Sequence, residues 1–134
     1  MPLLVAEQST DALSVTFEQG PEMLVWWATE VECESAIARL ERAGDLTGET
    51  TLESRARLDA LADGWHEVQP VKAVRRAARR LLRVHPLRSA DALQLAAALV
   101  GCEGDPATLE IVSLDAHLID AARREGFTIL DLDD

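Results

Sequence analysis

Residues 88–99, with the sequence RSADALQLAAAL, constrain the fold more than any other stretch of the chain. The pattern predicts a helix with apolar or small side chains on nearly every face, with Ser89 as its N-cap and Gly101 as its end. Such a helix has almost no polar face, so we expect it to pack against a sheet. The only charge between Arg88 and Glu103 is Asp91, in the first turn. An acid there has an ordinary explanation, because it complements the helix dipole by less than about 1 kcal/mol.

The composition is typical of one domain with a substantial core. The chain has 134 residues, of which 48% are hydrophobic, and we expect a single domain over residues 1–134. No apolar run is long enough to span a membrane, and the first residues lack the basic segment of a signal peptide. Cys33 and Cys102 are isolated and have no metal-ligand spacing, which favours a reduced, cytoplasmic protein.

Short apolar runs alternate with helical patterns along the chain. We expect strands at residues 24–28, 65–68, 109–114 and 127–132. We expect further helices at residues 11–19, 30–43, 50–62, 71–84 and 116–125. Thr10, Thr29 and Asp115 are the expected N-caps of three of these helices. Alternation of this kind implies parallel strands joined by right-handed crossovers, so the predicted fold class is α/β.

Three acidic residues are placed to meet at one edge of this sheet. Glu32 follows the strand at residues 24–28, Asp115 follows the strand at 109–114, and Asp91 begins the buried helix. Sites in open α/β sheets lie outside the carboxyl ends of the strands, near a topological switch point. Clustered carboxylates favour a hard divalent cation such as Mg²⁺, which activates water and stabilises charge on a phosphoryl group. Ser113 is placed to orient a carboxylate or a water there.

Each acid also has a purely structural interpretation, which stays open at this point. Asp115 is a good N-cap in its own right, and Glu32 is an ordinary first-turn acid beside Glu30 and Glu34. The chain holds 24 acidic residues, so some coincidence of position is expected. No glycine-rich phosphate loop, nucleophile elbow or dinucleotide-binding motif competes with the metal-site hypothesis.

Charge is distributed unevenly along the chain. The net charge of −11 by itself disfavours nonspecific binding of nucleic acid. Residues 68–90 contain no acid, however, and they hold seven of the 13 basic residues: Lys72, Arg75, Arg76, Arg79, Arg80, Arg83 and Arg88. Two interpretations stay open, a solvated helix face that balances acids on neighbouring elements, or a basic stripe that binds a polyanion.

Three segments together resemble a known family. Residues 29–37 (TEVECESAI), 87–96 (LRSADALQLA) and 112–118 (VSLDAHL) are similar to the successive acidic motifs of PIN-domain proteins. Within that family they look most like the VapC-type toxins of bacterial toxin–antitoxin pairs. The resemblance follows the whole chain in order, and LRSADALQLA is its most specific part.

The resemblance implies a Mg²⁺- or Mn²⁺-dependent endoribonuclease that is the toxin of a type II toxin–antitoxin pair. It further implies a homodimer, an RNA substrate and neutralisation by a cognate antitoxin. It places Glu32, Asp91 and Asp115 on the metal-site acids of the family. It also makes the basic segment a surface for RNA or for the antitoxin, with these RNA-binding residues: Arg75, Arg79, Arg83 and Arg88.

The start of the chain departs from the family pattern. The family opens with a central hydrophobic strand that ends in a metal-binding Asp, whereas residues 1–7 (MPLLVAE) resemble the helix after that strand. We therefore expect a three-layer, PIN-like α/β/α sandwich with a parallel sheet whose first strand and its Asp are missing. One explanation is a true start roughly ten residues upstream. The other is a catalytically impaired binding module that keeps the dimer and antitoxin contacts.

Overall fold

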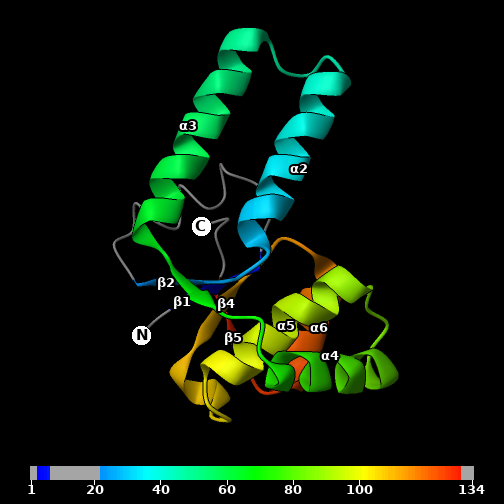
Figure 1. Cartoon of the computed structure of the whole chain (residues 1–134). Helices are drawn as coiled ribbons and strands as arrows, with labels where there is room; N and C mark the ends of the chain where they lie inside the picture. The colour runs from blue at the N-terminus through cyan, green and yellow to red at the C-terminus, as the bar shows by residue number, and fades with distance from the viewer. Residues whose placement is uncertain (1–2, 7–21, 131–134) are drawn as a thin grey trace.

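A sheet of parallel strands runs through the middle of the protein, as the computed structural model shows for residues 3–6 and 22–130 (Figure 1). Within these residues the strand order is β3-β2-β1-β4-β5, and every pairing is parallel. The strands are β1 (Leu3–Val5), β2 (Met23–Trp26), β3 (His66–Val68), β4 (Glu110–Val112) and β5 (Thr128–Ile129). The predicted parallel α/β architecture is thereby confirmed.

Helices cover both faces of the sheet. Their bounds are α2 (Thr29–Arg42), α3 (Gly48–Gly64), α4 (Lys72–Val84), α5 (Ser89–Gly101) and α6 (Ala116–Arg124), with a short 3-10 helix η1 (Pro106–Thr108) before β4. Helices α2 and α3 form a hairpin that projects from one face, and α4, α5 and α6 lie against the other (Figure 1). Arg55 of α3 joins the two helices of this hairpin by ion pairs with Glu34 (2.8 Å) and Glu41 (3.6 Å) of α2.

Alternating side chains of the strands build two separate cores. Leu4 and Ile111 pack with the apolar side chains of α4, α5 and α6. Leu3, Val5 and Val112 pack on the opposite face with those of α2 and α3. Because successive strand residues point to opposite faces, β1, β2 and β4 each contribute to both cores. The predicted three-layer α/β/α sandwich is therefore confirmed.

Strand β1 lies at the centre of the sheet, so the prediction that the first strand is missing is wrong. Leu4 is fully buried and is paired with Leu24 of β2 on one side and with Ile111 of β4 on the other. After the strand, the backbone N–H of Ala6 continues the ladder by donating to Val112 O at 2.9 Å. A short apolar run such as residues 3–5 is compatible with a helical turn and with a strand. Here it forms a strand because its backbone pairs with β2 and β4.

Helix α5 packs closely over the sheet, as its composition predicts. Its buried side chains are mostly alanine, which lets the helix axis approach the strands. At Gly101 an added Cβ would lie 2.9 Å from a methyl carbon of Leu24, so a larger residue there would push that side chain aside. The predicted Ser89 N-cap is wrong, because Arg88 occupies the N-cap position without a side-chain hydrogen bond. Helix α5 is therefore stabilised by packing against the sheet and forms without a side-chain cap.

Several predicted boundaries shift by a few residues. Thr29 is the first residue of α2 and is buried, whereas the N-cap is Ala28. Helix α3 begins earlier than expected, because Thr47 and Thr50 form a capping box. The helix predicted at residues 11–19 with its Thr10 cap lies outside the described residues. No helix of the described ranges is both long and apolar enough to cross a membrane.

Candidate functional site

The strand order creates a topological switch point between β1 and β4. The chain moves outward from β1 through β2 to β3, and then crosses to the other side of β1 to form β4. In open α/β sheets, ligands bind at such a point outside the carboxyl ends of the strands. Helix α2 follows β2 directly and α6 follows β4 directly. The first turns of both helices therefore lie at this edge, as do the acids that they carry.

Gln94 connects helix α5 to the first turn of α2. Its Nε2 atom donates hydrogen bonds to Oγ1 of Thr29 and to Oε1 of Glu32, each at 3.3 Å. Gln94 is 3% exposed and Thr29 is fully buried, so this contact is shielded from solvent. Asp91 lies one turn before Gln94, on the same side of α5, because residues i and i+3 share a helix face. This contact joins the first turn of α2, which carries Glu32, to α5 one turn after Asp91, and Gln94 is a residue that the sequence analysis missed.

Asp115 begins helix α6 in the way its capping interpretation predicts. Its Oδ1 atom accepts a hydrogen bond from the backbone N–H of Leu118 at 2.9 Å, and the side chain is exposed. The backbone N–H of Asp115 donates to Oγ of Ser113 at 3.1 Å, and Ser113 is buried. Ser113 therefore holds the turn that carries Asp115, and its contact is with the backbone of that residue.

The described part of the chain does not gather the three acids into a compact metal cluster. No group of three His, Cys, Asp or Glu side chains within residues 3–6 and 22–130 is placed to hold a metal ion. Mg²⁺, however, is commonly bound through only one or two carboxylates together with waters and substrate phosphates. Glu32 and Asp91 provide such carboxylates, and Oε1 of Gln94 is a buried oxygen without a hydrogen-bond donor among the described residues. Carboxylate oxygens of this kind are the ligands that a hard divalent cation prefers.

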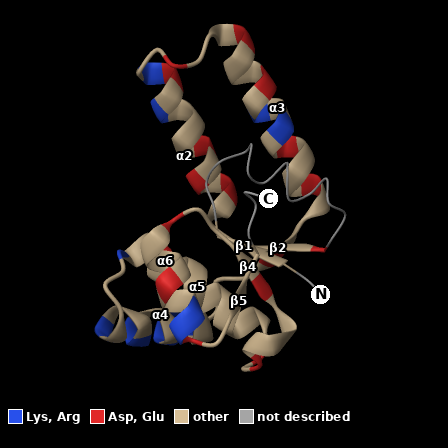
Figure 2. Ribbon diagram, turned by 180° about the vertical axis from the view of Figure 1, so that it is seen from behind, with Lys and Arg blue, Asp and Glu red and all other residues tan. Residues whose placement is uncertain are grey.

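Helix α4 presents a strongly basic surface (Figure 2). Arg76, Arg79 and Arg83 are exposed and line a shallow depression of about 180 Å³. Among the described residues these three arginines make no ion pair. Of the predicted RNA-binding residues, Arg75 is exposed beside a second, mainly apolar depression, and Arg88 is exposed at the start of α5. Arg76 belongs to the basic segment of residues 68–90 but was not among the predicted RNA-binding residues.

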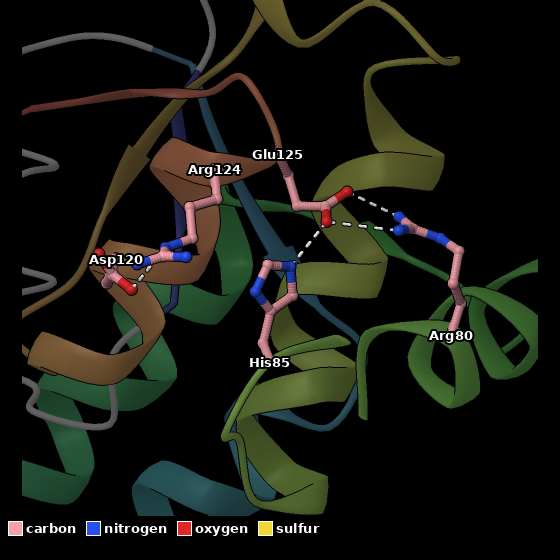
Figure 3. Close-up of polar contacts among 5 residues, drawn as sticks. All are labelled: Arg80, His85, Asp120, Arg124 and Glu125. Atoms are coloured by element: carbon pink, nitrogen blue, oxygen red, sulfur yellow. Dashed lines mark hydrogen bonds and ion pairs between the residues drawn. The ribbon is translucent and has the colours of Figure 1, made fainter. Parts of the chain in front are cut away.

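One arginine of α4 has a structural partner instead. Arg80 makes two hydrogen bonds to the Glu125 carboxylate, at 2.6 and 3.3 Å, and Nε2 of buried His85 donates to the same carboxylate at 2.7 Å (Figure 3). The hydrogen bonds from Arg80, and then those from His85, lower the pKa of Glu125 below its ordinary value of 4.5, although partial burial opposes this. The three residues tie α4 to the end of α6.

Comparison with solved structures shows the same fold in three other proteins. The chain matches PAE2754 from Pyrobaculum aerophilum at 16% identity with a TM-score of 0.67, over 96% of this chain and 89% of that chain. It matches FitAcB from Neisseria gonorrhoeae at 18% identity and a TM-score of 0.59, over 98% and 97% of the two chains. It matches VapBC-1 from nontypeable Haemophilus influenzae at 9% identity and a TM-score of 0.61, over 98% of each chain.

These likenesses establish the fold alone. No protein-family model matches the chain, and no curated protein matches it. FitAcB and VapBC-1 are names of complexes, and a likeness at this level of identity does not assign the chain to either partner of such a complex. Because the first strand is present and no family is established, the prediction of a VapC-type PIN-domain toxin that lacks its first strand is wrong.

Proposed function

We propose that the protein is the nuclease component of a toxin–antitoxin pair and that it cleaves RNA with the help of Mg²⁺ or Mn²⁺. The observation that carries the proposal is the contact of Gln94 with Glu32, which brings the acid of α2 beside the Asp91 turn of α5 at the switch point. The fold shared with FitAcB and VapBC-1 supports a role of this class.

Glu32, Asp91 and Asp115 are the proposed metal-binding and catalytic acids. A bound divalent cation activates water for attack and offsets the charge that develops on a phosphoryl group. Glu32 stands in the first turn of α2 and Asp91 in the first turn of α5, and the proposal assigns both carboxylates to one cation. Asp115 follows β4 and keeps one oxygen on the Leu118 N–H, and the proposal assigns its other oxygen to the cation.

The proposed partners of the protein follow from its surface. RNA is expected on the basic face of α4, where Arg76, Arg79 and Arg83 have no ion-pair partner among the described residues. Cationic side chains of this kind bind phosphates without selecting a sequence. A cognate antitoxin and a second copy of the chain complete the proposed assembly.

The test is cleavage of a structured RNA by the full chain in Mg²⁺ and in EDTA. We expect cleavage in Mg²⁺ that stops in EDTA and that falls by about 100-fold in Asp91→Asn. Asp59→Asn is the matched control, because Asp59 is an exposed acid on α3. Equal cleavage by the wild type and Asp91→Asn would contradict the proposal.

A second candidate function is a catalytically silent module that keeps the antitoxin and dimer contacts. Two observations favour it: the described residues hold no group of three metal-binding side chains, and Asp115 already serves as a helix cap. This candidate predicts no Mg²⁺-dependent cleavage by the wild type, together with stable binding to the antitoxin. The RNA assay therefore separates the two functions.

A further inference from the structure

We infer that Gln94 is a positioning residue that holds the Glu32 carboxylate toward Asp91 and so sets the affinity of this edge for a divalent cation. The inference rests on the proposed function. It assigns a role to a side chain that is neither one of the three acids nor part of the basic surface. It concerns a link between two helices that no sequence pattern of this chain predicts.

Gln94 of α5 contacts two residues on one face of α2. The two hydrogen bonds from Nε2 of Gln94 reach the first turn of α2, at positions 65 and 62 residues away in the sequence. Thr29 and Glu32 are three residues apart, so both contacts fall on the same face of α2. The Gln94 amide thus fixes the rotation of that turn relative to α5. The Glu32 carboxylate accepts one of these bonds through Oε1.

Burial of the Gln94 amide costs free energy, because one of its two polar atoms has no partner among the described residues. Gln94 is 97% buried, since only 3% of it is exposed, and its Oε1 accepts no hydrogen bond within the described residues. A buried oxygen without a donor costs about 1–3 kcal/mol. The neighbouring buried positions of α5 are alanine and leucine, and a leucine would fill this position without that cost. A glutamine in this place is therefore explained better by its hydrogen bond to Glu32 than by packing.

The amide of Gln94 holds a side chain that is proposed to bind the cation. When Nε2 is engaged with Glu32 and Thr29, Oε1 of the same amide is the remaining polar atom of the side chain. Partners that orient a metal-binding side chain change metal affinity or activity by about 10- to 100-fold when they are removed. Loss of the Gln94 amide should therefore act on cation binding through Glu32, while the fold is retained.

The experiment measures the Kd of Mn²⁺ by calorimetry on the full chain. Gln94→Met keeps the length of the side chain and removes the amide, and we expect the Kd to rise by about tenfold or more. Gln69→Met is the matched control, because Gln69 is exposed beyond β3, and its Kd should equal that of the wild type. The thermal midpoint without metal, followed by circular dichroism, reports the stability of each variant.

A double-variant cycle separates positioning from a general effect. In a Glu32→Gln background, Gln94→Met should no longer change the Kd, because the carboxylate through which it acts is gone. An unchanged Kd in Gln94→Met with a wild type that binds Mn²⁺ would overturn the inference and leave the proposed function intact. A wild type that binds no Mn²⁺ would overturn the proposed function itself. A lower thermal midpoint with an unchanged Kd would show that Gln94 is only a packing residue.

Discussion

The carboxylate of Asp115 accepts a hydrogen bond from the backbone N–H of Leu118 at 2.9 Å, and this single bond gives the acid a structural role at the start of α6. The same side chain is one of the three proposed metal-binding acids. The two roles differ in what they need: an amide oxygen can cap a helix, whereas binding of a divalent cation needs the negative charge. Substitution of this residue therefore separates capping from chemistry.

Asp115→Asn is expected to keep the free energy of unfolding within about 0.5 kcal/mol of the wild type, because asparagine is an equally good cap. Asp115→Ala should lower it by about 1 kcal/mol. Both variants should lose most of the Mg²⁺-dependent cleavage of RNA. Urea denaturation and the RNA assay give the two readouts, and full cleavage by Asp115→Asn would show that the residue is a cap alone.

Acid should destabilise the protein through Glu125. Its pKa is lowered in the folded state, chiefly by Arg80, so its contribution is present above its ordinary value of 4.5 and is lost as the pH falls below it. Glu125→Gln should therefore lower the free energy of unfolding by about 1 kcal/mol at pH 7 and show a shallower loss between pH 5 and 3. Urea denaturation across this range tests the prediction.

The control for Glu125 is Asp120→Asn. Asp120 pairs with Arg124 on the surface of α6, where both side chains are more than half exposed, at 61% and 70%. Exposed pairs of this kind contribute little, so the pH dependence of this variant should follow that of the wild type. If Glu125→Gln and the wild type lose stability in parallel below pH 5, the network at Glu125 does not contribute as described.

The central place of β1 predicts a large effect at Leu4. This side chain is fully buried between two neighbouring strands, so Leu4→Ala should lower the free energy of unfolding by about 2–5 kcal/mol. Leu52→Ala, at a position of α3 that is 69% exposed, should change it by no more than about 0.5 kcal/mol. Similar midpoints in urea for the two variants would mean that Leu3–Val5 is not a core strand.

The basic surface of α4 predicts a salt-dependent affinity for RNA. Replacing Arg76, Arg79 and Arg83 together by alanine should weaken binding and reduce the slope of log K against log salt concentration by about 2. The control removes the same charge elsewhere, by alanine at Arg42, Arg57 and Arg124, which are exposed on α2, α3 and α6. Equal slopes for the two triple variants in fluorescence anisotropy titrations would exclude the α4 surface as the RNA contact.

Local patterns predicted most of the fold. The burial of α5, the order of strands and helices and the cap at Asp115 all depend on residues close together in the sequence. Strand β1 could not be predicted in the same way, because a run of three apolar residues acquires its identity from distant partners in β2 and β4. Strand β1 was therefore missed because a local sequence pattern does not show which distant strands a segment pairs with.

The candidate site, like the fold, could be predicted from local sequence patterns only in part. The acids at positions 32, 91 and 115 stand out because each follows a strand or begins a helix. Gln94 also carried a signal, as the one polar side chain in the middle of an apolar helix. Its meaning depends on Thr29 and Glu32, which are more than 60 residues away, and no local pattern reports such a contact.

The most direct test of the central claim is a titration of Mn²⁺ followed by the electron paramagnetic resonance signal of the free ion. The claim is that the edge formed by Glu32 and Asp91 binds a divalent cation. The wild type should remove Mn²⁺ from solution at one site per chain, and Mg²⁺ should displace it. Asp91→Asn should leave the signal of the free ion unchanged by protein. Equal Mn²⁺ binding by Asp91→Asn and the wild type, or none by either, would contradict the claim.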